Sequence, residues 1–372
     1  PAAATCSSAR DAATVVSMST TLAVRAGAIG ALAVLVLAGC APAPERPGEN
    51  GGGEAFCARM VTNSGGLDDR SFNDASWKGL QDAADEYGIG VDVLVSTSET
   101  DLEPNVQQAV DTGCGFILTV GYELAPSTAD QAAKNPDVDF AIVDEFVDAP
   151  NVKPIVFDTA QAAYLAGYLA AGVSQTGKVA TFGGGNQPPV TLFMDGFVDG
   201  VAKYNEVHGT AGVALGWDKA TQDGVFTGDF EDINKGLTTA QEFIDQGADV
   251  ILPVAGQVGE GAARAALDSG TASIIWVDSD GYDTLSPDFR PVLLTSVLKN
   301  TGSAVVEIVK TSIDDTFDNA PFIGTLENGG VGIAPFHDLA LRVSAELSAE
   351  IDQLRSDIVA GTIVVTSPST PR

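Results

Sequence analysis

The stretches VQQAVDTGCGFILTVG (106–121) and AQEFIDQGADVILPVAG (240–256) decide the fold, because they share one pattern. Each begins as a helix-like segment, stops at a glycine, continues as a short apolar strand and ends at a second glycine. The glycines that stop the two helices, Gly113 and Gly247, are 134 positions apart. The match indicates an internal repeat.

The same offset holds for the next strand of each unit. These strands end at Asp144 and Asp278, again 134 positions apart, which indicates two lobes of similar topology. Ligands of open α/β sheets bind beyond the carboxyl ends of the strands. We therefore expect Gly121, Asp144, Gly256 and Asp278 to surround one cleft between the lobes.

Short apolar runs alternate with helix-like segments through most of the chain. The clearest strand-like runs are FILTV (116–120), FAIVD (140–144), VILPV (250–254) and IIWVD (274–278). In 231–246, the residues Ile233, Leu237, Ala240 and Ile244 recur at the spacing of one helix face. Apolar strands that alternate with helices predict an α/β fold with parallel sheets covered on both faces.

The composition excludes several classes of function. The chain has 372 residues, of which 45% are hydrophobic, and a formal net charge of −31. This acidity argues against binding nucleic acid, because neutralising phosphates needs clustered Lys and Arg. It also argues against a basic membrane-binding face. We expect no metal site and no cofactor, since neither His208 nor His337 has a partner at ligand spacing.

Residues 1–39 have the character of a signal peptide, with Met18 as a candidate start. Their apolar run (26–37) is too short to span a bilayer, and no positive flank follows it. The run ends in LAGC (37–40), which resembles the lipobox of bacterial lipoproteins and implies that Cys40 becomes a lipidated N-terminus. An ordinary secretory cleavage site is the alternative.

The residues after this leader, 40–53, are rich in Pro and Gly and predict a flexible tether. Together, the leader and the tether predict a protein outside the cytoplasm that is anchored to the cell membrane through lipid on Cys40.

The stretch VTNSGGLDDRSFNDASWKGL (61–80) connects a strand-like run to a helix. We expect Ser71 to cap the helix, with Asp74 three residues on. The loop and the helix N-terminus then point into the expected cleft. Phe72 is a lone aromatic residue at the end of this polar loop, which is a poor place for a core side chain.

This loop carries a family resemblance. The segment TNSGGLDDRSFN (62–73) is similar to the signature T-D-x-G-G-x-x-D-x-S-F-N of the basic membrane protein (BMP) family of substrate-binding lipoproteins, which includes purine nucleoside receptors of ABC transporters. The resemblance continues through most of 55–365, including GKVATFGGGNQPPV, QGADVILPVAGQVGEG and LENGGVGIAPF.

The resemblance implies a type I periplasmic-binding-protein fold, in which two Rossmann-like lobes joined by a three-stranded hinge close around a ligand. The three crossovers would fall near Phe157, near Leu298 and around Phe322. The N-terminal lobe would then comprise 54–157 and 298–322, and the C-terminal lobe 158–297 and 323–372.

The resemblance also implies a ligand site for a purine nucleoside. Phe72 and Phe230 would stack on the two faces of the base, with Phe226 as a competitor for the second position. Asp280 would bind the sugar hydroxyls next to the backbone of Gly256, and Asp278 is the alternative carboxylate.

The remaining expected contacts are polar. The full expected ligand set is Asn63, Asp69, Ser71, Phe72, Asn73, Asp144, Phe230, Gly256, Asp278, Asp280 and Lys299. Two positions depart from the family pattern: Asn63 replaces an aspartate, and Gly281 replaces a common glutamine. These departures bear on which base is preferred.

Beyond the leader and the lipobox Cys40, Cys57 and Cys114 are the only cysteines. An extracytoplasmic setting favours a disulfide over a free thiol. Both cysteines start strands that a doubly wound order makes neighbours in the first lobe, so we expect them to be bonded.

The sequence therefore predicts the binding lipoprotein of an ABC transporter, which captures a small molecule and presents it to a permease. Two alternatives remain open. One is a ligand-sensing surface lipoprotein without a transport role. The other is a nucleoside hydrolase, although no nucleophile with a base, and no phosphate-binding G-x-G-x-x-G motif, supports an enzyme.

Overall fold

The computed structural model describes residues 56–371. The predicted signal peptide, the lipidation of Cys40 and the tether fall outside the described residues. Within 56–371, no helix is both long enough and apolar enough to cross a membrane.

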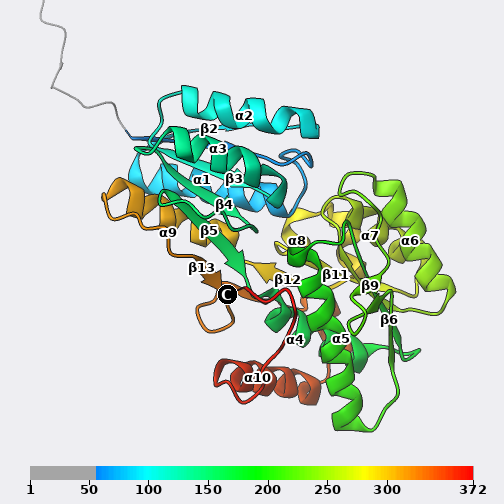
Figure 1. Cartoon of the computed structure of the whole chain (residues 1–372). Coiled ribbons are helices and arrows are strands. Elements are labelled where there is room, and N and C mark those ends of the chain that lie inside the picture. The colour runs from blue at the N-terminus through cyan, green and yellow to red at the C-terminus, as the bar shows by residue number, and fades with distance from the viewer. Residues whose placement is uncertain (1–55, 372) are drawn as a thin grey trace, which may run out of the picture. The chain divides into compact units, whose positions relative to one another are not determined.

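The first sheet is entirely parallel, and its six strands have the order β13-β5-β4-β3-β1-β2. Its strands are β1 (Cys57–Val61), β2 (Gly90–Leu94), β3 (Phe116–Val120), β4 (Asp139–Val143), β5 (Val152–Phe157) and β13 (Phe322–Gly324). Its helices are α1 (Phe72–Tyr87), α2 (Glu99–Asp111), the short η1 (Tyr122–Leu124), α3 (Ala125–Lys134) and α9 (Thr301–Ile313). Helices α1 and α9 pack together on one face and α2 and α3 on the other (Figure 1). We call this sheet with its helices the first lobe.

The second sheet also has six strands, in the order β14-β12-β11-β10-β6-β7, and only β14 is antiparallel. Its strands are β6 (Lys178–Gly183), β7 (Val213–Leu215), β10 (Val250–Val254), β11 (Ser273–Asp278), β12 (Leu293–Lys299) and β14 (Val331–Ile333). One face is covered by α4 (Thr159–Val173) and α5 (Pro188–His208), the other by α6 (Ile233–Asp245) and α7 (Val258–Ser269). We call this sheet with its helices the second lobe.

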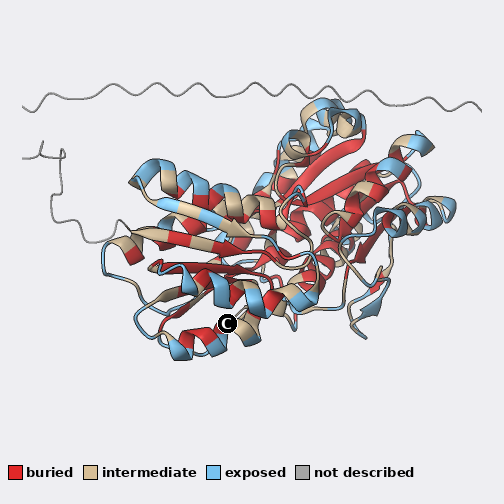
Figure 2. Cartoon of the chain, turned by 90° about the horizontal axis from the view of Figure 1, so that it is seen from above, coloured by how far each residue is buried: buried red, intermediate tan, exposed pale blue. Residues whose placement is uncertain are grey.

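Smaller elements complete the second lobe. They are the hairpin β8 (Trp217–Asp218) and β9 (Asp223–Gly224), α8 (Gly281–Thr284), η2 (Pro287–Val292), η3 (His337–Arg342) and α10 (Ala345–Val359). Burial follows the layers, because helices cover the central strands of both sheets on each side, whereas the edge strands β2 and β7 are partly exposed (Figure 2). Apolar side chains on both faces of a strand are what a parallel sheet requires.

The chain passes between the lobes three times, after β5, after β12 and between β13 and β14. This arrangement confirms the predicted fold class. The strand-like runs were also correct, since β3 and β10 have the predicted bounds and β4 and β11 begin one residue earlier than predicted.

The predicted disulfide is confirmed. Cys57 begins β1, which pairs in parallel with β3, and Cys114 lies two residues before β3. The two sulfur atoms are bonded, and the bridge spans a sequence separation of 57. It ties together the starts of two neighbouring strands of the first lobe.

The predicted buried face of α6 was wrong in part. Ala240 is buried and Leu237 and Ile244 pack against the core as expected, but Ile233 is 37% exposed, and the other buried positions are Gly236 and Phe243. The reason is close packing on α7: a Cβ on Gly236 would lie 1.9 Å from the backbone oxygen of Val258. This close contact sets the rotation of α6 about its own axis, and apolar periodicity does not predict that rotation.

Candidate functional site

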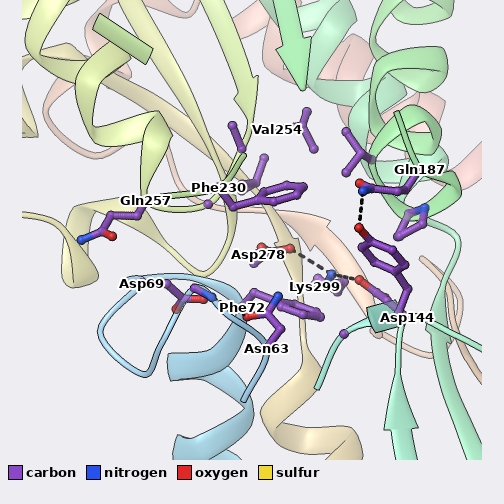
Figure 3. A pocket seen from close by; sticks show the side chains of 18 of the residues that line it. Asn63, Asp69, Phe72, Asp144, Gln187, Phe230, Val254, Gln257, Asp278 and Lys299 are labelled. Carbon is purple, nitrogen blue, oxygen red and sulfur yellow. Dashed lines mark hydrogen bonds and ion pairs between the residues drawn. The ribbon is translucent and has the colours of Figure 1, made fainter. Parts of the chain in front are cut away.

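A cavity opens between the two lobes at the carboxyl ends of their strands, as the repeat predicted (Figure 3). Eight of the expected ligand residues line it: Asn63, Asp69, Phe72, Asp144, Phe230, Gly256, Asp278 and Lys299. Its lining also includes residues that the sequence analysis did not name, among them Tyr122, Glu123, Gln187 and Phe193.

Phe72 is held by the tight turn that leads into α1. The carboxylate of Asp69 accepts hydrogen bonds from the backbone N–H groups of Ser71 (3.1 Å), Asn73 (2.8 Å) and Asp74 (3.1 Å). Burial raises the pKa of the Asp69 carboxyl to about 6, although these donors oppose the shift. The first residue of α1, Phe72, is thereby fixed at the cavity wall.

Ser71 and Asn73, which were expected to contact the ligand, are not in the cavity lining. Ser71 holds the N-cap position, but its side chain makes no capping bond, because its hydroxyl donates to the backbone oxygen of Asp69. The side chain of Asn73 donates to Asp69 and to Asn63. Both residues are fully buried behind the lining, so they support the turn and do not face the cavity.

Asn63 and Gly256 lie where the resemblance placed them, in the lining. The side-chain oxygen of Asn63 accepts from Asn73 Nδ2 at 2.7 Å and from the backbone N–H of Gly65 at 3.1 Å. Gly256 has φ +53, a left-handed conformation that glycine adopts without strain.

Phe230 faces Phe72 from the second lobe, on an irregular segment after β9 (Figure 3). The segment runs along the end of β6, where the N–H of Gly228 donates to the oxygen of Gly184 at 2.8 Å. A Cβ on Gly184 would lie 2.3 Å from the Phe230 ring, so this position has room only for glycine. The competitor Phe226 is not in the lining and packs edge-on against Trp217, 5.9 Å between ring centroids.

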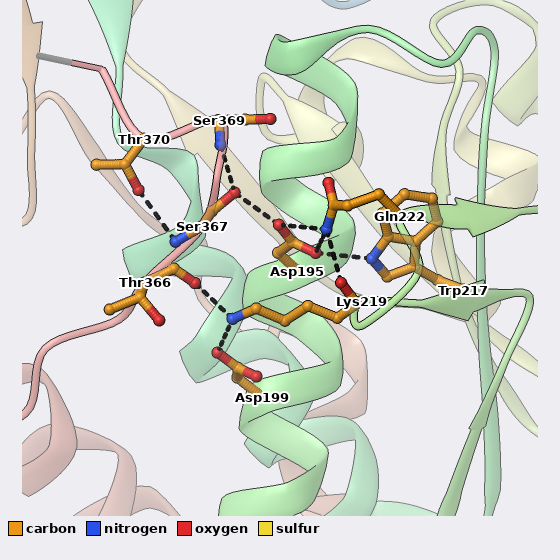
Figure 4. A network of polar contacts seen from close by, with 9 residues as sticks. All are labelled: Asp195, Asp199, Trp217, Lys219, Gln222, Thr366, Ser367, Ser369 and Thr370. Carbon is orange, nitrogen blue, oxygen red and sulfur yellow. Dashed lines mark hydrogen bonds and ion pairs between the residues drawn. The ribbon is translucent and has the colours of Figure 1, made fainter.

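A buried carboxylate on α5 holds the β8–β9 hairpin, which precedes the Phe230 segment in the chain (Figure 4). Asp195 of α5 is fully buried and accepts hydrogen bonds from Trp217 Nε1 (2.8 Å), Gln222 Nε2 (3.0 Å) and the Ser367 hydroxyl (2.6 Å). These donors come from the β8–β9 hairpin and from the C-terminal tail. Asp195 therefore joins α5, the hairpin and the tail at one point.

An ionic cluster forms the floor of the cavity. Lys299 Nζ lies 2.6 Å from Asp144 and 3.2 Å from Asp278, and the Lys299 side chain is only 4% exposed (Figure 3). Burial works against its charge, but the two carboxylates outweigh burial and raise the pKa of Lys299. The ammonium also lies 4.4 Å from the centroid of the Phe72 ring.

The two carboxylates of this cluster occupy equivalent positions of the repeat. Asp144 has φ 64 and Asp278 has φ 65, a left-handed conformation that aspartate tolerates better than most residues. Asp144 directly follows β4, Asp278 is the last residue of the equivalent strand β11, and both side chains meet at Lys299. One cluster thus joins the lobes.

Asp280 was expected to bind the sugar, and the structure places it outside the cavity lining. Its carboxylate accepts from the backbone N–H of Tyr282 at 3.1 Å, which caps α8, and lies 2.7 Å from Nε2 of His337. These contacts direct the side chain away from the cleft. Asp278, the alternative, is the carboxylate in the lining.

Tyr122, Glu123, Gln187 and Gln257 are the polar lining residues that sequence reasoning missed. Gln187 Nε2 donates to the hydroxyl of Tyr122 at 2.6 Å and links the lobes (Figure 3). Burial raises the pKa of the Glu123 carboxyl to about 7. A signal was present, because both Tyr122 and Glu123 directly follow Gly121, which the repeat had already placed at the cleft.

The arrangement is suited to holding a small flat molecule with polar substituents. Two aromatic rings come from opposite lobes, and carboxylate, ammonium and amide groups surround them. Within 56–371, no group of three or more His, Cys, Asp or Glu side chains is placed to hold a metal ion.

Comparisons with known proteins agree with this geometry. Residues 57–368 match the family described as PnrA-like ABC transporter substrate-binding proteins. The chain is 31% identical to the ABC transporter nucleoside-binding protein BmpA of Lactococcus lactis subsp. cremoris, over 91% of this chain and 97% of that one. It is 30% identical to basic membrane protein A of Borreliella burgdorferi, over 82% and 86% of the two chains.

Solved structures share the fold. A solute-binding protein of an ABC transporter system from Aeropyrum pernix K1 superimposes with a TM-score of 0.74 at 23% identity, covering 84% of this chain and 94% of that one. A second such protein, from Conexibacter woesei, gives a TM-score of 0.66 at 21% identity, covering 84% and 99%.

Proposed function

The chain belongs to the PnrA-like family of ABC transporter substrate-binding proteins, a family of binding proteins and not of enzymes, and on this premise we propose that it captures a purine nucleoside. The lobes close on the nucleoside and present it to a permease in the membrane. The protein does so outside the cytoplasm, as a lipoprotein anchored through Cys40.

The observation that carries this proposal is the pair of aromatic rings from opposite lobes. A purine base is flat and aromatic, and stacking on a protein ring contributes about 1–3 kcal/mol per base. Phe72 and Phe230 supply one ring from each lobe, so a base between them would favour the closed state over the open one.

The ionic cluster supports the sugar half of the ligand. Ribose offers neighbouring hydroxyl groups, and an ionised carboxylate can accept from two of them. Asp278 is the carboxylate of the second lobe in the lining, and we assign it this role. Lys299 holds Asp278 and Asp144 in place.

The relatives support the ligand class and the partner. The relative from Lactococcus lactis is named a nucleoside-binding protein of an ABC transporter, which favours a nucleoside here and a permease as the partner. The LAGC sequence at 37–40 favours lipidation of Cys40, and the disulfide fits an oxidising compartment. Mass spectrometry of the membrane fraction tests the anchor through a diacylglycerol on Cys40.

Isothermal titration calorimetry with adenosine, guanosine, inosine and uridine tests the ligand. We expect purine nucleosides to bind and Phe72→Ala to weaken them about 5- to 150-fold, which is the loss of one stacking contact. Phe317→Ala is the matched control, because Phe317 packs on the core outside the lining and its loss should leave affinity unchanged. Unchanged affinity in Phe72→Ala would contradict the stacking assignment, and no binding of any purine nucleoside would contradict the proposed function.

A further inference from the structure

Two polar side chains in the cavity lining carry acceptor atoms that have no partner. Glu123 Oε2 and Gln187 Oε1 are both shielded from solvent and neither accepts a hydrogen bond. The other shielded side-chain atoms without partners in 56–371 lie outside the lining, on Asn73, Asp158, Thr159, Trp276 and Arg355. Buried acceptors normally find a donor, and the carboxylate of Glu123, which only accepts, can take one from a molecule in the cleft.

Among the neighbouring groups, the side-chain amide of Asn63 lies close to the Glu123 carboxylate and opposes the rise of its pKa. The ionised carboxylate of Asp69 accepts from the backbone of its own turn and has no hydrogen to donate. Lys299 is committed to Asp144 and Asp278. One amide does not fill the acceptor sites of a carboxylate, so a molecule in the cleft can supply further donors to Glu123.

The two acceptors lie at the same end of the cleft although they come from opposite lobes. Glu123 lies in η1, after β3 of the first lobe, and Gln187 lies at the start of α5 in the second. The hydrogen bond between Gln187 and Tyr122 keeps Gln187 next to this turn. At Gly121 a Cβ would lie 2.7 Å from Glu123 Oε2, so the glycine leaves room for the carboxylate.

We propose that Glu123 and Gln187 form a subsite that reads the polar edge of the base and selects guanosine over adenosine. The inference rests on the proposed function. Guanine presents two adjacent donors, N1–H and the 2-amino group, which match an ionised carboxylate because that group only accepts. Adenine places the lone pair of N1 where guanine has N1–H, so the same carboxylate repels it.

Glu123 carries the selection and Gln187 supports it. The amide of Gln187 can turn so that Tyr122 donates to Oε1 and Nε2 faces the base, where it meets the O6 acceptor of guanine. An ionised carboxylate has no such second orientation. Glu123 is therefore the specificity-determining residue of this subsite.

The test is calorimetry with guanosine, inosine and adenosine on the wild type, Glu123→Gln and Glu99→Gln. Because burial raises the pKa of Glu123 to about 7, the titrations are run at pH 8, where the carboxyl is ionised. Glu99 is an exposed acid in the first turn of α2, outside the lining. Its substitution makes the same change in charge without removing a lining acceptor.

We expect the wild type to bind guanosine at least about tenfold more tightly than adenosine, with inosine between them because it lacks the 2-amino group. Glu123→Gln should weaken guanosine at least about tenfold and adenosine less than about threefold. Glu99→Gln should leave all three affinities unchanged.

Other results overturn the proposal. Equal affinity of the wild type for adenosine and guanosine contradicts the proposed subsite. This comparison needs no variant, so the test stands even if Glu123→Gln folds poorly. An equal loss of affinity for guanosine and adenosine in Glu123→Gln also contradicts the subsite. Such a result would show that Glu123 stabilises the cleft without distinguishing the bases. Binding of purine nucleosides without a base preference contradicts the subsite alone. No binding of any nucleoside contradicts both the proposed function and the subsite.

Discussion

The two aromatic walls of the cleft are held in opposite ways. Phe72 depends on Asp69, whose hydrogen bonds reach residues within five positions of it. Phe230 depends on contacts far apart in the chain. Its segment runs along Gly183 and Gly184, and the hairpin before it is tied through Asp195 to the tail at Ser367.

This difference indicates which wall can be changed by mutation without affecting the rest of the protein. A local turn forms from one short segment, so changes at Asp69 should remain close to the first lobe. The second wall is assembled from α5, the hairpin and the tail, and a change in any of these parts reaches the others. We therefore expect the second wall to couple ligand affinity to global stability more strongly than the first.

The largest expected effect comes from Asp195→Ala. The substitution leaves the Trp217, Gln222 and Ser367 donors without their buried acceptor, at a cost of about 3 kcal/mol or more in the free energy of unfolding. We expect a lower urea midpoint together with weaker nucleoside binding. Asp199→Ala is the control, because Asp199 is on the same helix as Asp195 but is one-third exposed, and its carboxylate pairs with Lys219. This substitution should lower the free energy of unfolding by about 1 kcal/mol or less. Equal costs for the two variants would remove the special role given to Asp195.

The next effect concerns pH and the first wall. The pKa of Asp69 is about 6 in the folded protein against 3.8 for an ordinary aspartate, so the folded state binds a proton more tightly than the unfolded chain. The contribution of Asp69 protonation to the free energy of unfolding is therefore fully present below pH 4 and is lost as the pH rises through 6. This loss amounts to at most about 3 kcal/mol.

Asp69→Asn removes this titrating group while keeping a residue suited to the turn. Its free energy of unfolding should fall less than that of the wild type between pH 4 and pH 6.5 in urea titrations. Asp68→Asn, at a neighbouring side chain that is 85% exposed, should follow the wild type. A parallel course of all three proteins would show that Asp69 is charged throughout this range.

The smallest effect is expected from Ser367→Ala. It removes one of the three donors to Asp195 and leaves the other two, at a cost of about 1 kcal/mol. If the tail supports the second wall, the melting temperature and the affinity should both fall slightly. Ser356→Ala in α10, which removes an exposed hydroxyl that donates within its own helix, should change neither. A loss of stability without any loss of affinity would separate the tail from the cleft.

Much of the fold could be predicted because its signals are local. Apolar runs marked the strands, and the offset of 134 placed Asp144 and Asp278 at equivalent strand ends, where both adopt the left-handed conformation. The disulfide followed from two cysteines at the starts of strands that neighbour each other in the fold. Phe72 was recognisable because an aromatic residue in a polar loop has no obvious place in a core.

The remaining features depend on contacts that no short segment reveals. Asp280 lies outside the cleft because His337, 57 positions further along the chain, pairs with it. The face of α6 is set by the approach of Gly236 to α7. Asp195 and Gln187 gain their roles from partners far away in the chain, so hydrophobic periodicity and motif spacing did not identify them.

A crystal structure of the protein grown with guanosine tests the central claim most directly. The account predicts the base between the rings of Phe72 and Phe230, with a ribose hydroxyl within hydrogen-bond distance of Asp278. A base bound away from these two rings, or a cleft that holds no nucleoside, would contradict it.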